Sequence, residues 1–164
     1  MLIFCSGMLR SGSAFQYNLV SSLLESMGKC IRHGRWEPRE KFKESQLLVW
    51  AKDPEVFHVI KSARYPEEIN LAKQGQARIF YIHRDIRDIA VASKFKWGVE
   101  GEKLIEILDL AQSSHNLMEK TGAFDASDWC LKQKYEEVFL NTEQAVKQHA
   151  EFLQLNPPDE IIQK

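Results

Sequence analysis

The chain begins with a short apolar run that passes directly into a loop rich in glycine and serine, Cys5-Ser6-Gly7-Met8-Leu9-Arg10-Ser11-Gly12-Ser13-Ala14. The apolar run predicts a strand over residues 2–5, and the amphipathic pattern after Gly12 predicts a helix. A strand that turns sharply into a helix directs unpaired backbone N–H groups and the positive end of the helix dipole at one point. The sequence therefore predicts an anion site at this turn.

The residues of this loop restrict the kind of anion. Gly7 and Gly12 have the spacing of the glycines in G-x-x-x-x-G-K-[ST], but Ser13 stands at the lysine position. The cation, Arg10, precedes the second glycine and can donate a forked, charge-assisted hydrogen bond to a phosphate or sulfate, with Ser11 and Ser13 as further donors. The alternative is an ordinary Gly/Ser turn with a solvated arginine. The pattern favours a phosphate-like group over the β- and γ-phosphates of a magnesium nucleoside triphosphate.

The overall charge argues against some classes of partner. The 164 residues include 22 Lys and Arg against 23 Asp and Glu, a net charge of −1, so nothing suggests a nucleic acid or membrane partner. The hydrophobic fraction of 44% and the length predict one soluble domain over residues 1–164. The three cysteines lack paired spacing, and no leader or membrane span is evident, so we expect a cytoplasmic protein.

Predicted strands and helices alternate along the chain. Further strands are expected over 56–60, 78–83 and 129–135, and helices over 66–74, 86–95, 102–120 and 142–153. Residues 29–46 are polar and basic and predict a functional loop, whereas 46–50 is compatible with a strand or a helix. The alternation predicts a three-layer α/β/α fold with a central, mainly parallel sheet, which binds ligands beyond the carboxyl ends of its strands.

A second strand-to-helix junction carries Arg84-Asp85-Ile86-Arg87-Asp88-Ile89-Ala90-Val91-Ala92-Ser93. Two arginines at such a junction can hold another phosphate, at the same edge of the sheet as the first loop. The two aspartates can instead form ion pairs with them at the start of the helix. Both interpretations stay open at this point.

These segments resemble motifs of the sulfotransferases that use 3′-phosphoadenosine 5′-phosphosulfate (PAPS). The run Leu9-Arg10-Ser11-Gly12-Ser13-Ala14-Phe15 resembles the family's 5′-phosphosulfate loop, P-K-S-G-T-T-W. The Arg84 segment resembles its 3′-phosphate motif, R-D-P-R-D-V-x-V-S. Lys134-Tyr135-Glu136-Glu137-Val138, with the later Phe152-Leu153-Gln154-Leu155, resembles the family's Y-E-D-L segment and its helix with F-L-G-L. The matches follow the family's order over most of the chain.

The resemblance implies a P-loop α/β fold and transfer of a sulfuryl group from PAPS to a hydroxyl or amine of a small-molecule or glycan acceptor. It implies release of 3′,5′-ADP and requires no metal. Arg10 would stabilise charge on the bridging oxygen, Arg84 would bind the 3′-phosphate, and Tyr135 would lie near the adenine. The implied cofactor-binding residues are Arg10, Ser11, Gly12, Ser13, Ala14, Arg84, Ser93 and Tyr135, of which Arg10 is also catalytic.

Two departures from the family pattern concern the site itself. The family serine eight residues after the arginine is Ala92 here, and Ser93 lies about 100° further around the helix. The family's K-[ST]-H, which carries the general base, corresponds to Lys61-Ser62-Ala63, so the histidine is missing. Other titratable groups that come into question as a base are His33, Glu37 and His58.

The C-terminal Arg-Lys-Gly loop of many family members has no counterpart here, which weakens 3′-phosphate binding or leaves it to Arg87 and Lys94. These departures keep two alternatives open. One is a non-catalytic module that binds PAPS or 3′,5′-ADP. The other is a small-molecule P-loop kinase, which the missing lysine after Gly12 disfavours.

Overall fold

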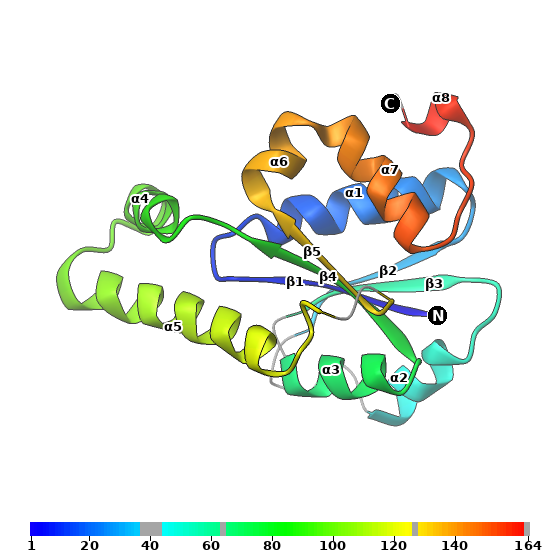
Figure 1. The fold of residues 1–164 in the computed structure, drawn as a ribbon, viewed down its shortest axis with the longest axis horizontal. Coiled ribbons are helices and arrows are strands. Elements are labelled where there is room, and N and C mark those ends of the chain that lie inside the picture. The colour runs from blue at the N-terminus through cyan, green and yellow to red at the C-terminus, as the bar shows by residue number, and fades with distance from the viewer. Residues whose placement is uncertain (37–43, 63–64, 126–127, 163–164) are drawn as a thin grey trace.

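The computed structural model describes residues 1–36, 44–62, 65–125 and 128–162. The strands are β1 (Leu2–Gly7), β2 (Cys30–Arg35), β3 (Phe57–Lys61), β4 (Ala77–His83) and β5 (Cys130–Lys134). The helices are α1 (Ser13–Ser26), α2 (Glu44–Ala51), α3 (Tyr65–Lys73), α4 (Ile86–Trp97), α5 (Gly101–Lys120), α6 (Tyr135–Leu140), α7 (Thr142–Phe152) and α8 (Asp159–Ile162). Strands and helices alternate over most of the chain (Figure 1), as the sequence predicts.

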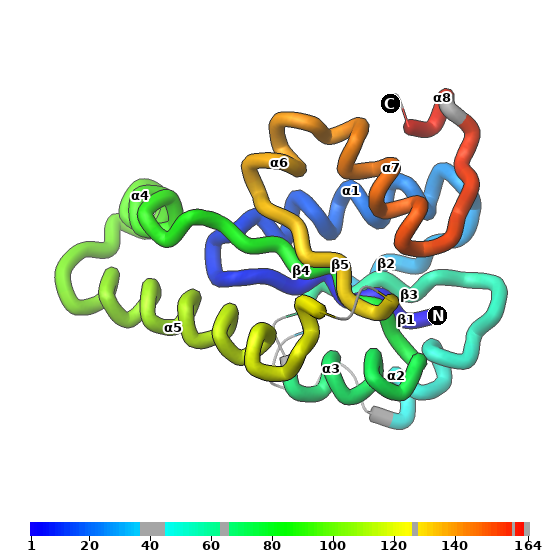
Figure 2. The backbone as a smooth tube through the Cα atoms, viewed as in Figure 1, coloured from blue at the N-terminus to red at the C-terminus, as the bar shows by residue number. Residues whose placement is uncertain are grey.

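The strands form a parallel sheet in the order β2-β3-β1-β4-β5. Helices α1, α6 and α7 cover one face, and α2, α3 and α5 cover the other (Figures 1 and 2). All residues of β1 are buried, because a central parallel strand is covered on both faces. The predicted three-layer α/β/α fold with a parallel sheet is confirmed.

Successive side chains of β1 enter the two layers alternately, as the pleat of a strand requires. Leu2 and Phe4 belong to the core that includes residues of α2, α3 and α5, whereas Ile3 and Cys5 pack against α1. This double burial anchors β1 firmly. The loop that follows Gly7 is therefore held at the centre of the carboxyl edge of the sheet.

The prediction of a functional loop over residues 29–46 is wrong for its first part, where β2 forms an edge strand. The pattern hides this strand because its side chains are half-buried or exposed, and because the ladder to β3 shifts register between Arg32 and Gly34. Such a bulge interrupts the period-two alternation that identifies a strand. Residues 37–43 of the predicted loop lie outside the described residues, and the ambiguous segment 46–50 lies within α2.

The structure also describes the cysteines and the helices, which composition predicts to be unpaired and too short or too polar to span a membrane. All three cysteines are free thiols, with Cys5 and Cys130 buried. Burial raises the pKa of Cys130 to about 12 and the pKa of Cys30 to about 11. None of the helices in the described ranges combines the length and the apolar character that crossing a bilayer demands.

Candidate functional site

The loop between β1 and α1 has a backbone that only glycine fits at two positions. Gly12 has φ of 95°, and a Cβ there would lie 2.6 Å from Cε2 of Tyr135. A Cβ at Gly7 would lie 2.7 Å from both Cγ2 of Ile82 and Oγ of Ser11. Real Cβ atoms do not approach other atoms so closely. The two glycines of the motif therefore let the loop pack against the end of β4 and against Tyr135.

Ser11 holds this loop together from the inside. Its buried hydroxyl lies 2.7 Å from the carbonyl oxygen of Met8 and 2.8 Å from that of Ile82, and its amide N–H donates to Met8 as well. The Ser11 side chain, predicted to bind an anion, thus shapes the loop in this structure. Ser13 and Ala14 open α1, whose N-terminus has no side-chain cap, and the first N–H groups of a helix lack partners within it.

Arg10 lies where the loop meets the C-terminal half of α4. This residue has a positive φ of 64°, and its Nη2 donates to the carbonyl oxygen of Ala92 at 3.4 Å. Its guanidinium carbon lies 4.9 Å from the centroid of the Trp97 ring, a cation–π contact. Its Nε is buried and has no hydrogen-bond partner in the described part of the chain. The cation is therefore held in place by an aromatic face while one polar atom stays unsatisfied.

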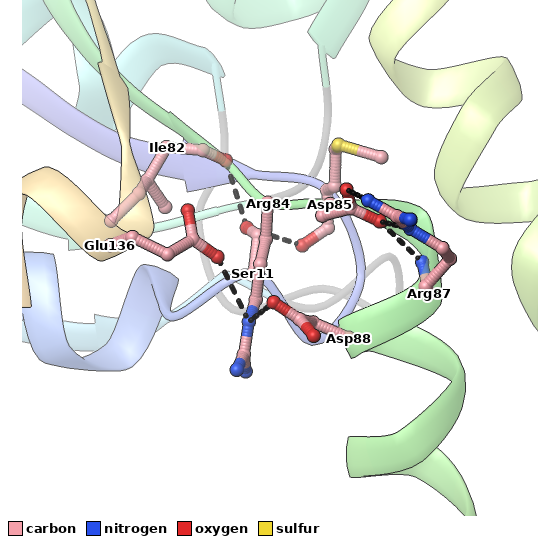
Figure 3. Close-up of polar contacts among 8 residues, drawn as sticks. Ser11, Ile82, Arg84, Asp85, Arg87, Asp88 and Glu136 are labelled. Atoms are coloured by element: carbon pink, nitrogen blue, oxygen red, sulfur yellow. Dashed lines mark hydrogen bonds and ion pairs between the residues drawn. The ribbon is translucent and has the colours of Figure 1, made fainter.

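Arg84 follows β4 and lies between three side chains. Its Nε is 3.5 Å from a carboxylate oxygen of Glu136 and 3.8 Å from one of Asp88. Its guanidinium carbon lies 4.5 Å from the centroid of the Tyr135 ring. Figure 3 shows the terminal nitrogens of Arg84 pointing away from both carboxylates. Within the described residues these terminal nitrogens have no partner, so the fork of the guanidinium is available to a ligand.

The aspartate alternative applies to both arginines, closely for Arg87 with Asp85 and at the longer distance of 3.8 Å for Arg84 with Asp88. The carboxylate of Asp85 lies 2.7 Å from Nη2 of Arg87 and also caps α4 by accepting from the amide of Arg87 (Figure 3). These hydrogen bonds hold the pKa of Asp85 well below its usual range. Arg87 is 86% exposed, and Lys94 pairs with Glu100 at 2.6 Å. Each of these two cations is therefore paired with a carboxylate.

Tyr135 and Ser93 are two further residues of the predicted set, and Tyr135 contacts Arg84. Tyr135 opens α6, packs against Gly12 and is 5.7 Å from the ring of Phe139, so its ring joins the loop to Arg84. Ser93 is fully buried on α4, and its hydroxyl has no hydrogen-bond partner among the described residues. The structure thus brings Arg84 and Tyr135 to the loop that carries Arg10, and it places Ser93 on α4 next to Ala92, whose carbonyl oxygen accepts from Arg10.

The histidines considered as a general base lie elsewhere. Nε2 of His33 is 2.9 Å from Nδ1 of His58, whose Nε2 is 3.1 Å from Asp53. His33 also stacks on Trp50 with 3.7 Å between ring centroids, and burial lowers its pKa to about 4. His58 is paired in register with Leu2, at the amino end of β1, whereas the loop follows the carboxyl end. Ala63 and Glu37 lie outside the described residues.

Three residues that the structure places at the site have no role in the motif resemblance. Trp97 supports Arg10, and one carboxylate oxygen of Glu136 lies near Arg84. Both carboxylate oxygens of Glu136 are buried and accept no hydrogen bond from the described residues. Glu68 of α3 is fully buried and accepts a hydrogen bond from Ser6, directly before the loop. Glu136 stood within a recognisable motif, but the contacts of Trp97 and Glu68 are long-range and leave no local signal.

The site holds cations and orphaned polar atoms rather than a metal-ligand set. No cluster of histidine, cysteine and acidic residues in the described ranges has the makeup of a metal site. The buried Nε of Arg10, hydroxyl of Ser93 and carboxylate of Glu136 lack hydrogen-bond partners there. Buried polar groups without partners are costly, and they mark a place where a ligand completes the hydrogen bonding. Arg10 and Ser93 offer hydrogen-bond donors to such a ligand, whereas the carboxylate of Glu136 offers only acceptors.

Solved structures share this fold at low sequence identity. Mouse sulfotransferase SULT7A1, solved in complex with PAP, has a TM-score of 0.68 and 19% identity, over 98% of this chain and 60% of that protein. Retinol dehydratase matches at 16% identity with TM-scores of 0.62, in complex with retinol and PAP, and 0.63, with androsterone and inactive cofactor PAP. Those alignments cover 99% of this chain and 62% of retinol dehydratase. No protein-family model and no curated protein matches the chain. The chain spans about 60% of the length of SULT7A1 and shares the fold of the sulfotransferases.

Proposed function

We propose that this protein binds PAPS at the carboxyl edge of its sheet and transfers the sulfuryl group to a hydroxyl or amine of an acceptor, releasing 3′,5′-ADP. The observation that carries the proposal is the pair of arginines beside Tyr135. Arg10 and Arg84 follow the adjacent strands β1 and β4, and each has a guanidinium held by an aromatic ring. PAPS and 3′,5′-ADP carry anionic groups at both the 5′ and the 3′ positions, which matches two separate cations.

The residues present fit such a nucleotide. The helix N-terminus at Ser13 and Ala14, together with Arg10, offers N–H donors to the 5′-phosphosulfate. The terminal nitrogens of Arg84 offer a fork to the 3′-phosphate, and the orphaned hydroxyl of Ser93 is a further donor. Tyr135, which contacts both Gly12 and Arg84, would lie near the adenine. The structures of similar fold were solved with PAP bound, which supports this assignment.

The chemistry that PAPS supplies is a sulfuryl group joined to the 5′-phosphate through a bridging oxygen. In the transfer, the acceptor oxygen or nitrogen forms a bond to sulfur, the bond from sulfur to the bridging oxygen breaks, and that oxygen keeps the electron pair. The acceptor proton passes to solvent or to a base. Arg10 acts by stabilising negative charge on the departing phosphate, the kind of electrostatic contribution that dominates many enzymes.

A non-catalytic PAPS-binding module is the second candidate. The observation in its favour is the position of His33 and His58, which are bound to each other at a distance from the loop and cannot accept the acceptor's proton. A general base contributes about 10²–10⁴-fold to a rate, so slow transfer without one is still transfer. An assay of transfer from radiolabelled PAPS to a panel of phenols, amines and sugars separates the two candidates.

Calorimetric titration with 3′,5′-ADP, ADP and Mg-ATP tests the nucleotide site first. We expect 3′,5′-ADP to bind tightest and Arg84→Gln to weaken it by at least about tenfold, because a hydrogen bond to a charged group contributes about 1.5–3 kcal/mol. Arg87→Gln is the matched control, since Arg87 is paired with Asp85 and exposed. Preference for Mg-ATP, or equal losses in both variants, would refute the proposal.

A further inference from the structure

A cavity of about 800 Å³ lies beside the edge strand β5. Its walls come from β5 and from α6 and α7, the two helices that follow this strand (Figure 1), together with Arg78 near the start of β4. None of the described residues that line it belongs to the predicted nucleotide site. Its volume is in the range of cavities that bind small molecules. The cavity is therefore a second candidate site.

One wall of the cavity carries amide side chains. Asn141, Gln144 and Gln148 are spaced three and four residues apart at the start of α7 and along it, so they lie on one face of the helix. Gln133 of β5 and Gln154, which follows the helix, also line the cavity. An amide side chain carries both hydrogen-bond donors and an acceptor. This wall therefore suits a ligand whose own polar groups both donate and accept.

Gln133 is the buried amide of this wall, with an exposed fraction of 6%, and three side chains hold it in place. Its Oε1 accepts from Nε2 of Gln16 at 3.1 Å and lies 2.7 Å from Nε2 of His149. Its Nε2 donates to Oε1 of Gln148 at 2.9 Å. The amide nitrogen carries two N–H groups, and the described residues provide a partner for one of them. The network thus fixes the orientation of Gln133 and leaves one donor unused.

This buried network is costly for the fold. Burial lowers the pKa of His149 to about 3, so at pH 7 its neutral ring carries a single N–H, which faces Gln133. Nδ1 of His149 and Oε1 of Gln16 are buried and lack a hydrogen-bond partner in the described part of the chain. An apolar side chain in place of Gln133 would avoid such unsatisfied groups. Costs of this kind are typical of functional sites, where a polar group is held ready for a ligand.

The charges around the cavity disfavour an anionic ligand. Among the described residues that line it are three carboxylates and two cations: Asp128, Glu137, Glu151, Arg78 and Lys132. Arg78 donates to the carbonyl oxygen of Phe152, and the ammonium of Lys132 lies 4.0 Å from the centroid of the Phe124 ring. Both cations are thus engaged within the protein. A phosphate or sulfate in this cavity would meet more negative than positive charge.

We infer that this cavity binds a short neutral saccharide. The hydroxyl groups of a sugar both donate and accept, which matches the amides of Gln133, Gln144 and Gln148. The C–H faces of the sugar rings gain from apolar surface, which Leu131 and Phe152 provide in the same cavity. Because the site is separate from Arg10 and Arg84, the inference goes beyond the proposed function and does not depend on it.

Saturation-transfer NMR with neutral trisaccharides tests the inference, with maltotriose, cellotriose and N,N′,N″-triacetylchitotriose as the probes. We expect at least one of them to bind with a Kd of about 1 mM or tighter and to shift the side-chain amide signals of Gln133 and Gln148. Gln148→Ala should weaken this binding by at least about threefold, the equivalent of one lost hydrogen bond. Gln74→Ala, the matched control, removes an exposed amide that follows α3 on the other face of the sheet and should leave Kd unchanged (Figure 1).

The remaining outcomes would overturn the inference. One is the lack of saturable binding of every trisaccharide at about 10 mM. Another is binding that neither Gln144→Ala nor Gln148→Ala weakens, or that 3′,5′-ADP displaces, because the sugar then lies elsewhere. Both glutamines are exposed, so these substitutions do not threaten the fold. A protein that binds a trisaccharide through these residues but does not bind 3′,5′-ADP would keep this site and lose the proposed function.

Discussion

The contact between Gly12 and Tyr135 makes a quantitative prediction about the loop. Gly12→Ala forces an alanine into a positive φ, which costs about 1–2 kcal/mol for an L-residue. Its methyl group would also lie 2.6 Å from a carbon of the Tyr135 ring, and overpacking of this kind costs about 1–3 kcal/mol. We therefore expect Gly12→Ala to lower the free energy of unfolding by about 2–5 kcal/mol, a large part of the stability of a domain.

Gly28 provides the control that separates the two costs. It also has a positive φ, 67°, but a Cβ there would meet no atom within 4 Å. Gly28→Ala should cost only the conformational part, about 1–2 kcal/mol. In a double-mutant cycle, Tyr135→Ala should remove the steric part of the Gly12→Ala cost, giving a coupling energy of about 1–3 kcal/mol.

The assay is urea unfolding followed by circular dichroism, with each variant measured for both the midpoint and the slope. Equal costs for Gly12→Ala and Gly28→Ala would show that the ring does not confine the loop. The same conclusion would follow if the costs of Gly12→Ala and Tyr135→Ala were simply additive. Either result would remove the structural link between the loop and Tyr135.

Three other expectations can be checked on the same protein. Burial lowers the pKa of His149 to about 3, so the unfolded chain binds this proton at a higher pH than the folded chain does. His149 alone should therefore lower the free energy of unfolding by about 2 kcal/mol from pH 7 to pH 5, in addition to the contributions of His33 and His83, whose pKa values burial also lowers. His149→Gln should flatten this dependence in urea titrations, and an unaltered slope would count against it. Trp97→Leu should weaken 3′,5′-ADP binding by about two- to fivefold in calorimetry, the equivalent of an exposed cation–π contact with Arg10, and an unchanged Kd would contradict this. Iodoacetamide should modify native Cys30 before the more deeply buried Cys130, as mass spectrometry of timed samples would show, and the reverse order would be inconsistent with the structure.

The parts of the fold that the sequence predicts are those with strong local patterns. An apolar run before a Gly/Ser loop identifies β1, and Asp85 with a 3.6-residue repeat identifies α4. The sequence does not predict β2, because an edge strand needs few apolar residues and a bulge disturbs its alternating pattern. The sequence does not predict α6 either, because this helix, Tyr135–Leu140, is short and follows β5 without an intervening loop.

The candidate site likewise has a part that the sequence predicts and a part that it does not. The carboxyl ends of parallel strands lie at the same edge of a sheet, so the sequence predicts that residues after β1 and β4 lie near each other, and the structure places Arg10 and Arg84 there. What their side chains contact depends on groups distant in the chain: Trp97 for Arg10 and Glu136 for Arg84. Pairings of this kind arise from packing between elements and leave no periodic signal. The use of the Ser11 hydroxyl inside the loop is likewise visible only in three dimensions.

The strand order β2-β3-β1-β4-β5 divides the carboxyl edge into two halves with different freedom to change. Arg10 and Arg84 follow β1 and β4, two neighbouring strands of the kind that lie about 4.8 Å apart in any sheet. The backbone hydrogen bonds between these strands therefore help to set the distance between the two arginines. A nucleotide that contacts both arginines allows little change in the positions of β1, β4 and β5. The ends of β2 and β3 carry no such constraint, so under the proposed function new acceptors can evolve at that side of the sheet while the nucleotide site stays fixed.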